Sequence, residues 1–168
     1  GVTNGRGGKG TIYVFSGGNG LVNQDNSNYD GYANAIEVIA VGAISDTGFR
    51  AFYSEPGANL AVSVPSNGGL HSTSITTTDL VGADGFNTAL TAGVSDLTDS
   101  NYTSVFGGTS ATCPQVAGVV SLMLQANPNL GWRDVKEILI RSARPVQASD
   151  PDWLMNGAGL HFNHKYGA

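Results

Sequence analysis

The chain has 168 residues, of which 40% are hydrophobic and only 12% are charged, with 24 glycines. This composition excludes a disordered chain and indicates one loop-rich folded domain, because the length leaves no room for two comfortable cores. The net charge of −5 argues against nucleic acid or an anionic membrane as a partner and suits a cationic substrate. No stretch reaches the length of a membrane span, and no signal peptide is visible.

The chain begins with a predicted loop and a predicted strand. Residues 1–10 are rich in glycine, whereas residues 11–16, with the sequence TIYVFS, form an apolar run of β-branched and aromatic residues. Such a run is typical of a buried strand in a parallel sheet. Asn19 follows directly, between glycines, at the end where open α/β sheets hold their sites. It is either a turn residue with positive φ or a site residue.

Two more strands are predicted before the middle of the chain. Residues 36–43 form an apolar run, and residues 58–65 alternate apolar and other side chains. From residue 67 to residue 106 the pattern weakens, and residues 81–101 are polar and aperiodic. A loop of that length in a compact domain is usually functional or mobile, and we expect one here.

The segment that follows centres on Ser110. Glycines precede this serine, and a long apolar run follows it to residue 124, which predicts a buried helix that begins near Ser110 with Pro114 in its first turn. A serine at a helix N-terminus has an unpaired N–H and lies where the helix dipole favours an anion. It can be a nucleophile or simply a helix cap. Cys113, the single cysteine, fits a small buried hydrophobe.

The C-terminal third predicts a second helix and a packing segment. Residues 132–143 place Val135, Ile138 and Leu139 on one helical face. The last twenty residues carry aromatic side chains that suit packing against the rest of the domain. No internal repeat is present.

The sequence around Ser110 resembles the nucleophile motif of subtilisin-like serine proteases. Residues 108–118 read GTSATCPQVAG, which matches Gly-Thr-Ser-Ala-x-x-Pro-x-x-Ala-Gly. Further segments that resemble the kexin and furin branch of that family are residues 5–14, 25–32, 53–55, 75–80, 127–135 and 164–167. The resemblance covers most of the chain, apart from an insertion around residues 81–105. It implies an α/β fold with a parallel sheet and helices on both faces, of which this chain is a part.

The resemblance also implies roles for five residues. Ser110 corresponds to the nucleophile, and Asn19 to a donor that holds the oxyanion of acyl transfer. Asp30 corresponds to an acid in the pocket for a basic side chain, which a carboxylate can pair with. Asp25 and Glu55 correspond to calcium ligands, although Ca²⁺ takes six to eight oxygens and needs more than these two. From local sequence alone, each of the three acids could equally be a turn residue.

A serine nucleophile needs a base and a group that orients the base. In subtilisin-like enzymes the order is Asp, His, Ser, yet residues 1–18 contain neither Asp nor His. The histidines present, His71, His161 and His164, are interpreted as structural or surface residues. We therefore expect residues 1–168 to be the C-terminal part of a catalytic domain whose N-terminal part, with the triad Asp and His, lies outside this chain.

Two functional hypotheses follow. In the first, the chain is part of a calcium-dependent serine endopeptidase that cleaves after basic residues, secreted or periplasmic like its family, and inactive as this piece alone. Its partners are peptide or protein substrates and the N-terminal part of the catalytic domain. In the second, the chain is a non-catalytic α/β module for binding or structure. The sequence before residue 1 distinguishes them, because only the first requires an Asp and a His there.

Overall fold

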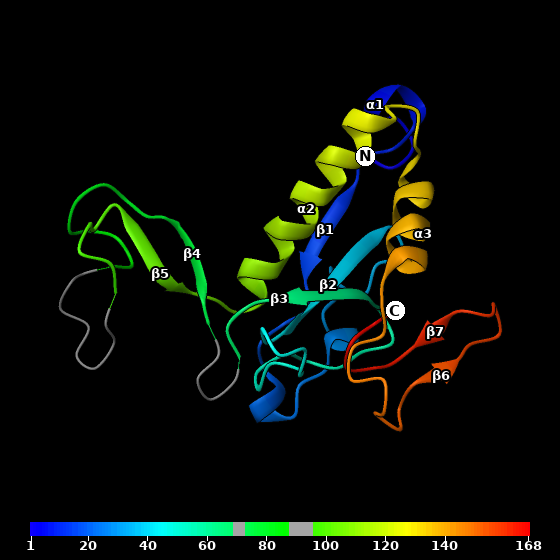
Figure 1. Ribbon diagram of the computed structural model, residues 1–168. Helices are drawn as coiled ribbons and strands as arrows, with labels where there is room; N and C mark the ends of the chain where they lie inside the picture. The colour runs from blue at the N-terminus through cyan, green and yellow to red at the C-terminus, as the bar shows by residue number, and fades with distance from the viewer. Residues whose placement is uncertain (69–72, 88–95) are drawn as a thin grey trace.

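A three-stranded parallel sheet forms the centre of the fold. The computed structural model describes residues 1–68, 73–87 and 96–168. Strands β1 (Tyr13–Ser16), β2 (Val38–Ile44) and β3 (Leu60–Pro65) lie in the order β1-β2-β3, with Tyr13 opposite Val38 and Ala40 opposite Leu60. The parallel strands predicted from the sequence are confirmed. All three point the same way, so their carboxyl ends form one edge (Figure 1).

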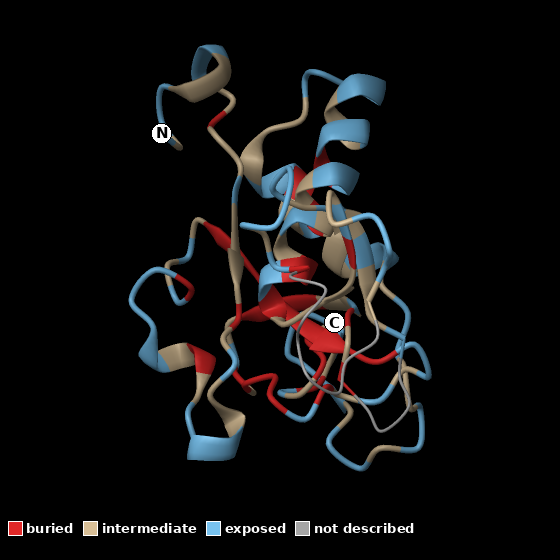
Figure 2. Ribbon diagram, turned by 90° about the vertical axis from the view of Figure 1, so that its left-hand side faces the viewer, coloured by how far each residue is buried: buried red, intermediate tan, exposed pale blue. Residues whose placement is uncertain are grey.

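Burial differs sharply between the strands. Every residue of the central strand β2 is buried, whereas β1 is only half-buried and its Tyr13 is 37% exposed. The prediction of a buried first strand is therefore wrong for this chain, because β1 is an edge strand with a neighbour on one side only. Figure 2 shows the buried residues concentrated around the sheet.

Two long helices cover one face of the sheet. Helices α2 (Thr109–Ala126) and α3 (Trp132–Ser142) contribute Val116, Val120 and Val135 to a core cluster with Ile39 and Val41 of β2. On the other face, Ala40 and Leu60 pack against Ala33. That residue follows the short 3-10 helices η1 (Leu21–Asn23) and η2 (Ser27–Tyr29).

Helix α2 differs from the prediction in two respects. It begins at Thr109, so Pro114 is its sixth residue and lies beyond the first turn; without an N–H it cannot donate to the carbonyl of Ser110. The helix is also not buried all round, since Val119 is 47% and Leu122 66% exposed. In the part of the chain that the structure describes, no helix is long and apolar enough to cross a membrane.

Two short strands flank the loop predicted over residues 81–101. Strand β4 (Ile75–Thr78) pairs antiparallel with β5 (Tyr102–Phe106), and the pair extends away from the body (Figure 1). We call residues 73–87 and 96–106 the arm. The buried Asn87 stabilises it, because its side-chain amide donates to the carbonyls of Leu97 and Tyr102, each at 2.8 Å. The predicted loop of residues 81–101 thus lies between the two strands, and its described residues 81–87 and 96–101 contain no strand.

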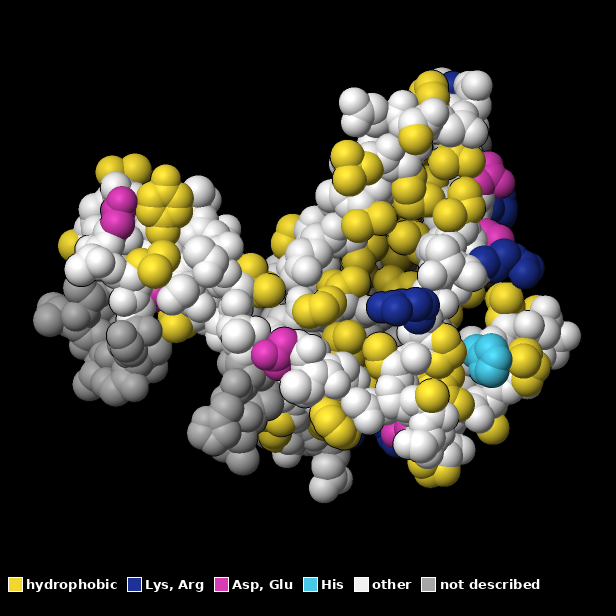
Figure 3. Space-filling model, viewed as in Figure 1, with side chains coloured by type: hydrophobic (Ala, Val, Ile, Leu, Met, Phe, Trp, Pro, Cys, Tyr) yellow, Lys and Arg dark blue, Asp and Glu magenta, His cyan; other side chains and the backbone are white. Residues whose placement is uncertain are grey.

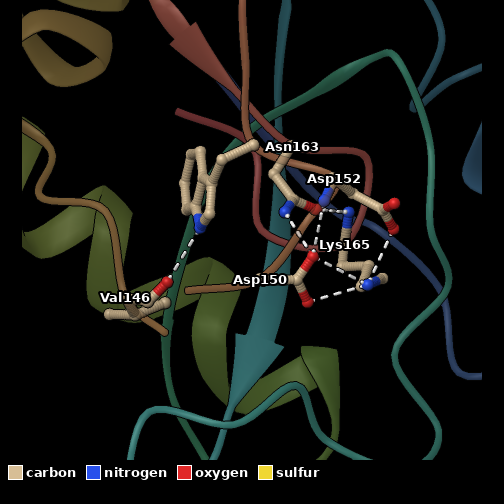
Figure 4. A network of polar contacts seen from close by, with 6 residues as sticks. Val146, Asp150, Asp152, Asn163 and Lys165 are labelled. Atoms are coloured by element: carbon tan, nitrogen blue, oxygen red, sulfur yellow. Dashed lines mark hydrogen bonds and ion pairs between the residues drawn. The ribbon is translucent and has the colours of Figure 1, made fainter. Parts of the chain in front are cut away.

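The ends of the chain are held by polar contacts. At the N-terminus, the short turn α1 (Gly5–Gly8) contains Arg6, whose guanidinium donates to the carbonyl of Leu130 at 3.0 Å. At the C-terminus, β6 (Leu154–Met155) pairs with β7 (His161–Phe162). Lys165 forms ion pairs with Asp150 and Asp152, each at 2.7 Å (Figure 4). The C-terminal packing segment predicted from its aromatic residues is thus a hairpin with its own network.

Candidate active site

Ser110 is the second residue of α2 and its side chain is exposed. The residue before the helix, Gly108, has φ 76° and ψ 177°, a conformation that glycine alone adopts readily. Phe106 at the end of β5 is separated from it only by Gly107. The helix begins beside Ser110, as the sequence pattern predicted, and the side chain of Ser110 faces solvent.

The segment before Ser110 is fixed to the end of β3. The backbone N–H of Gly108 donates to Asn67 Oδ1 at 2.9 Å, and Ser66 Oγ donates to the carbonyl of Gly108 at 3.0 Å. The hydroxyl of the buried Tyr53 donates to Asn67 Oδ1 at 2.8 Å. A Cβ on Gly107 would lie 2.0 Å from the Asn67 amide. These contacts leave the backbone at Ser110 little freedom to move.

Asn19 follows β1 and lies beside the start of α2. Its Oδ1 accepts hydrogen bonds from the N–H and the hydroxyl of Thr109, both at 2.9 Å. Because the backbone N–H of Thr109 can only donate, the Asn19 atom that it contacts is the amide oxygen. The Nδ2 of Asn19 therefore points away from Thr109. The turn-residue alternative for Asn19 does not explain these contacts.

The side-chain amide of Asn19 and the backbone nitrogen of Ser110 both lie close to Gly108, and the amide approaches it with Nδ2 and Oδ1 alike. A Cβ built on Gly108 would be 3.4 Å from Asn19 Nδ2 and 3.7 Å from the Ser110 nitrogen. Since Gly108 has no side chain, this position is open. The missing side chain of Gly108 thus leaves room beside two nitrogen donors at the positive end of a helix of 18 residues, where N–H groups favour an oxyanion.

Two further contacts join β1 to α2 behind Ser110. Ser16 Oγ donates to the carbonyl of Thr109 at 2.9 Å, and the Cys113 thiol lies 3.3 Å from the carbonyl of Val14. Cys113 is half-buried, and burial raises the pKa of its thiol. The expectation of a small packed side chain agrees with this environment.

Asp25 and Glu55 approach each other closely. A Cβ on Gly20 would lie 2.9 Å from Glu55 Oε1 and 3.0 Å from Asp25 Oδ2. Glu55 is buried, with 7% exposure, and its Oε1 accepts a hydrogen bond of 2.7 Å from the N–H of Gly20. Burial, together with the charges of Asp25 and Asp30, raises the pKa of Glu55, and the Gly20 hydrogen bond only partly opposes this.

This pair of carboxylates fits part of a calcium site. A buried carboxylate beside a second one is costly unless a cation offsets the charge, and hard oxygens suit Ca²⁺. Within residues 1–68, 73–87 and 96–168, no group of three or more Asp, Glu, His or Cys side chains gathers as a metal site. Asp25 and Glu55 could thus supply two of the six to eight oxygens that the ion takes.

Asp30 ends η2 and is exposed. Its Oδ1 accepts hydrogen bonds from the N–H of Tyr32 at 2.7 Å and of Ala33 at 2.9 Å. These bonds fix the direction of the carboxylate and leave Oδ2 available to a cation. A role as a turn residue therefore explains the hydrogen bonds of Asp30 Oδ1 but gives no role to Oδ2.

The histidines lie elsewhere. His161 and His164 belong to the C-terminal hairpin, where their rings contact Trp153 and Phe162 edge to face. His71 lies outside the described residues. The sequence interpretation missed the supporting residues Ser66 and Asn67. Both directly follow a predicted parallel strand, so the rule that sites gather at the carboxyl edge of a sheet could have identified them.

These features define a class of protein: an α/β fold in which an exposed serine at a helix N-terminus lies beside a fixed amide donor at the carboxyl edge of a parallel sheet. The sequence model of the subtilase family matches residues 2–168. The chain belongs to the subtilase family. The predicted family and the predicted subtilisin-like α/β fold are thereby confirmed.

Individual relatives agree with this assignment. The chain is 36% identical over 167 residues to furin-like protease 1 of Drosophila melanogaster, covering 99% of this chain and 14% of that protein. It is 37% identical over 167 residues to proprotein convertase subtilisin/kexin type 4 of Mus musculus, covering 99% and 23%. The chain thus spans less than a quarter of either relative.

Solved structures of an Aeromonas sobria protease have the same fold. The crystal structure of this serine protease matches with a TM-score of 0.84 and 28% identity, over 99% of this chain and 36% of that one. The same enzyme in complex with its chaperone matches with a TM-score of 0.83 and 27% identity, over 95% and 34%.

Proposed function

We propose that this chain is the nucleophile-bearing part of a serine endopeptidase that cleaves peptide bonds after basic residues. The observation that carries the proposal is that Asn19 Nδ2 and the backbone nitrogen of Ser110 lie together beside Gly108, whose missing side chain leaves room for a carbonyl oxygen. Negative charge develops on the carbonyl oxygen of the substrate during acyl transfer, and two donors at that position would stabilise it.

The chemistry assigned to Ser110 is acyl transfer. Its Oγ forms a bond to the substrate carbonyl carbon while a base takes the hydroxyl proton, and the carbonyl oxygen becomes the oxyanion between Asn19 and Ser110. The C–N bond then breaks, and the amine leaves with the proton from the base. Water hydrolyses the resulting ester by the same steps and regenerates Ser110.

The base and its orienting carboxylate are assigned to a segment N-terminal to this chain. In support, β1 pairs only with β2 among the described residues, and α2 exposes Val119 and Leu122. Figure 3 shows hydrophobic side chains on this side of the molecule. An unpaired strand edge and an exposed apolar helix face are both surfaces that proteins usually cover. We expect residues 1–168 alone to be inactive, because Ser110 lacks a base.

The substrate is assigned from Asp30 and from the overall charge. The free Oδ2 of Asp30 can pair with the guanidinium of an arginine or the ammonium of a lysine in the substrate. The net charge of −5 would favour the approach of such a substrate. The substrates are thus peptides or proteins with basic residues. A secreted or periplasmic location is assigned from the family resemblance alone.

Calcium is assigned to Asp25 and Glu55, with further ligands from outside this chain. When bound, the ion would neutralise the two carboxylates and hold together the loops that carry Asn19 and Asp30. Glu55 is suited to this role because its backbone N–H also donates to the carbonyl of Gly18, at 3.3 Å. No chemical step passes through the ion.

The test uses the full-length protein and its Ser110→Ala variant, with two peptide amides that differ only in Arg or Glu before the cleaved bond. We expect cleavage of the Arg peptide only, dependence on added calcium after chelation, and loss of cleavage in S110A. If the Arg peptide is not cleaved, or S110A cleaves it equally well, the alternative of a non-catalytic α/β module is favoured.

A further inference from the structure

The arm carries exposed apolar side chains that the proposed peptidase chemistry does not use. Among its described residues, Leu80 is 65%, Val81 86%, Phe86 60% and Tyr102 45% exposed. Figure 3 shows hydrophobic side chains on the surface of the arm, at the left of the view. A cluster of this kind on a folded element marks an interaction surface more often than a scatter of single side chains does.

The arm is a folded element. Asp96 accepts hydrogen bonds from the hydroxyl of Thr103 and the N–H of Ser104, both at 2.6 Å, and Asp79 accepts one of 2.6 Å from the N–H of Asn87. The rings of Phe86 and Phe106 are in edge-to-face contact at 6.4 Å. The exposed apolar side chains of the arm therefore belong to an ordered, hydrogen-bonded structure.

The arm is also joined rigidly to the candidate active site. Strand β5 ends at Phe106, and only three residues separate it from Ser110. The connecting Gly107 and Gly108 are fixed by Asn67, as described above. Whatever binds the arm is consequently held at a fixed distance from Ser110.

The charge of the arm indicates the chemistry of its partner. Residues 73–106 contain four Asp and neither Lys nor Arg. Asp79 and Asp96 accept hydrogen bonds within the arm, and Asp99 Oδ1 accepts one from the N–H of Asn101, whereas Asp84 is exposed close to Val81 and Phe86 in the sequence. An acidic surface with apolar side chains is complementary to a polypeptide that is basic and partly apolar.

The position of the arm indicates which part of a substrate it contacts. In Figures 1 and 2 the arm and the segment of η2 with Asp30 extend from different sides of the start of α2. Asp30 is the proposed partner of the basic residue before the cleaved bond. A substrate with that residue at Asp30 and its carbonyl at Ser110 would continue toward the arm with the residues after the bond.

We propose that the arm is a docking surface for the substrate segment that follows the cleaved bond, a segment that is basic and partly apolar. This inference rests on the proposed function, because it takes Ser110 and Asp30 as the points that align the substrate. Docking on an acidic, apolar surface would select protein substrates by residues remote from the cleaved bond.

The experiment measures binding and so does not depend on turnover. The full-length S110A protein is titrated with two fluorescent peptides that share the same Arg segment. One ends two residues after the Arg, and the other continues for ten residues that alternate lysine and leucine. We expect the extension to improve the affinity about tenfold, a size typical of a small apolar and charged contact.

Two matched double variants complete the test. Leu80→Ser with Phe86→Ser removes two exposed side chains of the arm. Leu154→Ser with Phe49→Ser removes side chains of the same types and similar exposure, 57% and 59%, elsewhere. The first should abolish the gain from the extension, and the second should retain it.

The proposal is overturned if the extension gives no gain, which is the result expected if another part of the full-length protein covers the arm, or if the gain survives L80S/F86S. Failure of the proposed function has a different signature: the full-length protein with Ser110 intact would not hydrolyse the short Arg peptide.

Discussion

The side-chain oxygen of Asn19 accepts both the N–H and the hydroxyl of Thr109, each at 2.9 Å. One residue that follows β1 thereby fixes the first residue of α2, and its Nδ2 lies near Gly108. The same amide group has two tasks: its oxygen holds the structure and its nitrogen is left for a ligand. Variants at Asn19 can separate these tasks.

Asn19→Asp should lower kcat of the full-length enzyme strongly while it changes the melting temperature little. The aspartate keeps an acceptor for Thr109 but replaces the donor to the oxyanion by a second oxygen. The expected loss is about 10²–10³ in kcat, a size taken from subtilisin, for which the loss of such a donor is known. Asn19→Ala should lose activity and also stability, because Thr109 then lacks its acceptor. Equal kcat for N19D and the parent would contradict the assignment.

Gly108→Ala should impair both stability and activity. The backbone conformation of Gly108 (φ 76°, ψ 177°) costs about 1–3 kcal/mol for a residue with a side chain. The new methyl group would also occupy the position 3.4 Å from Asn19 Nδ2. Thermal unfolding and steady-state kinetics measure the two effects. Gly157→Ala, in the exposed turn between β6 and β7 with nothing near its Cβ, is the control and should retain activity.

Asp30→Asn should remove the preference for a basic residue without removing the nucleophile. The asparagine can still accept the N–H groups of Tyr32 and Ala33, so the local backbone is retained, but the charge is lost. We expect kcat/KM for an Arg peptide to fall about 10²-fold, the order of a lost charge-assisted contact. Kinetics with peptides that carry Arg or Gln before the bond measure it. An unchanged ratio of the two would place the basic pocket elsewhere.

Asp96 should make the stability of the arm depend on acid. Partial burial alone would raise the pKa of its carboxyl, but hydrogen bonds from Thr103, Ser104 and Leu97 outweigh burial and lower the pKa from 3.8 to about 2. Because the pKa is lower in the folded state, the stabilisation is present above about pH 4 and is lost as the pH falls toward 2.

Hydrogen exchange of the arm between pH 4 and pH 2 measures this effect. Asp96→Asn should open the arm more readily at pH 4, and the difference between variant and parent should shrink as the pH approaches 2. Asp84→Asn is the control, since Asp84 is an exposed carboxylate of the same arm. A difference that grows toward low pH would contradict the role given to Asp96.

The secondary structure of segments with a clear local sequence pattern could be predicted from the sequence. The apolar run of β2, the glycines before Ser110 and the helical period of α3 each reflect a rule that acts over a few residues. Asn19 could be singled out because it follows a strand. The sequence could not indicate which atom of its amide is free, since that depends on Thr109, 90 positions away.

Long-range packing explains the failures. The half-exposed β1 and the exposed side of α2 have sequences that suit burial, and what covers them cannot be deduced from local pattern. Strands β4 and β5 are stabilised mainly by polar contacts of Asn87 and Asp96, which are weak sequence signals. Ser66 and Asn67, which hold Gly108, also act through contacts 41 and 42 positions along the chain.

The most direct test of the account is covalent labelling of the full-length protein with a fluorophosphonate, which reacts with serine nucleophiles that have a base and an oxyanion site. Intact mass and peptide mapping give the number and position of labels. The account predicts one label per chain, on Ser110, and none in S110A. Cleavage of the Arg peptide without a label on Ser110, or a single label on another serine, would contradict it.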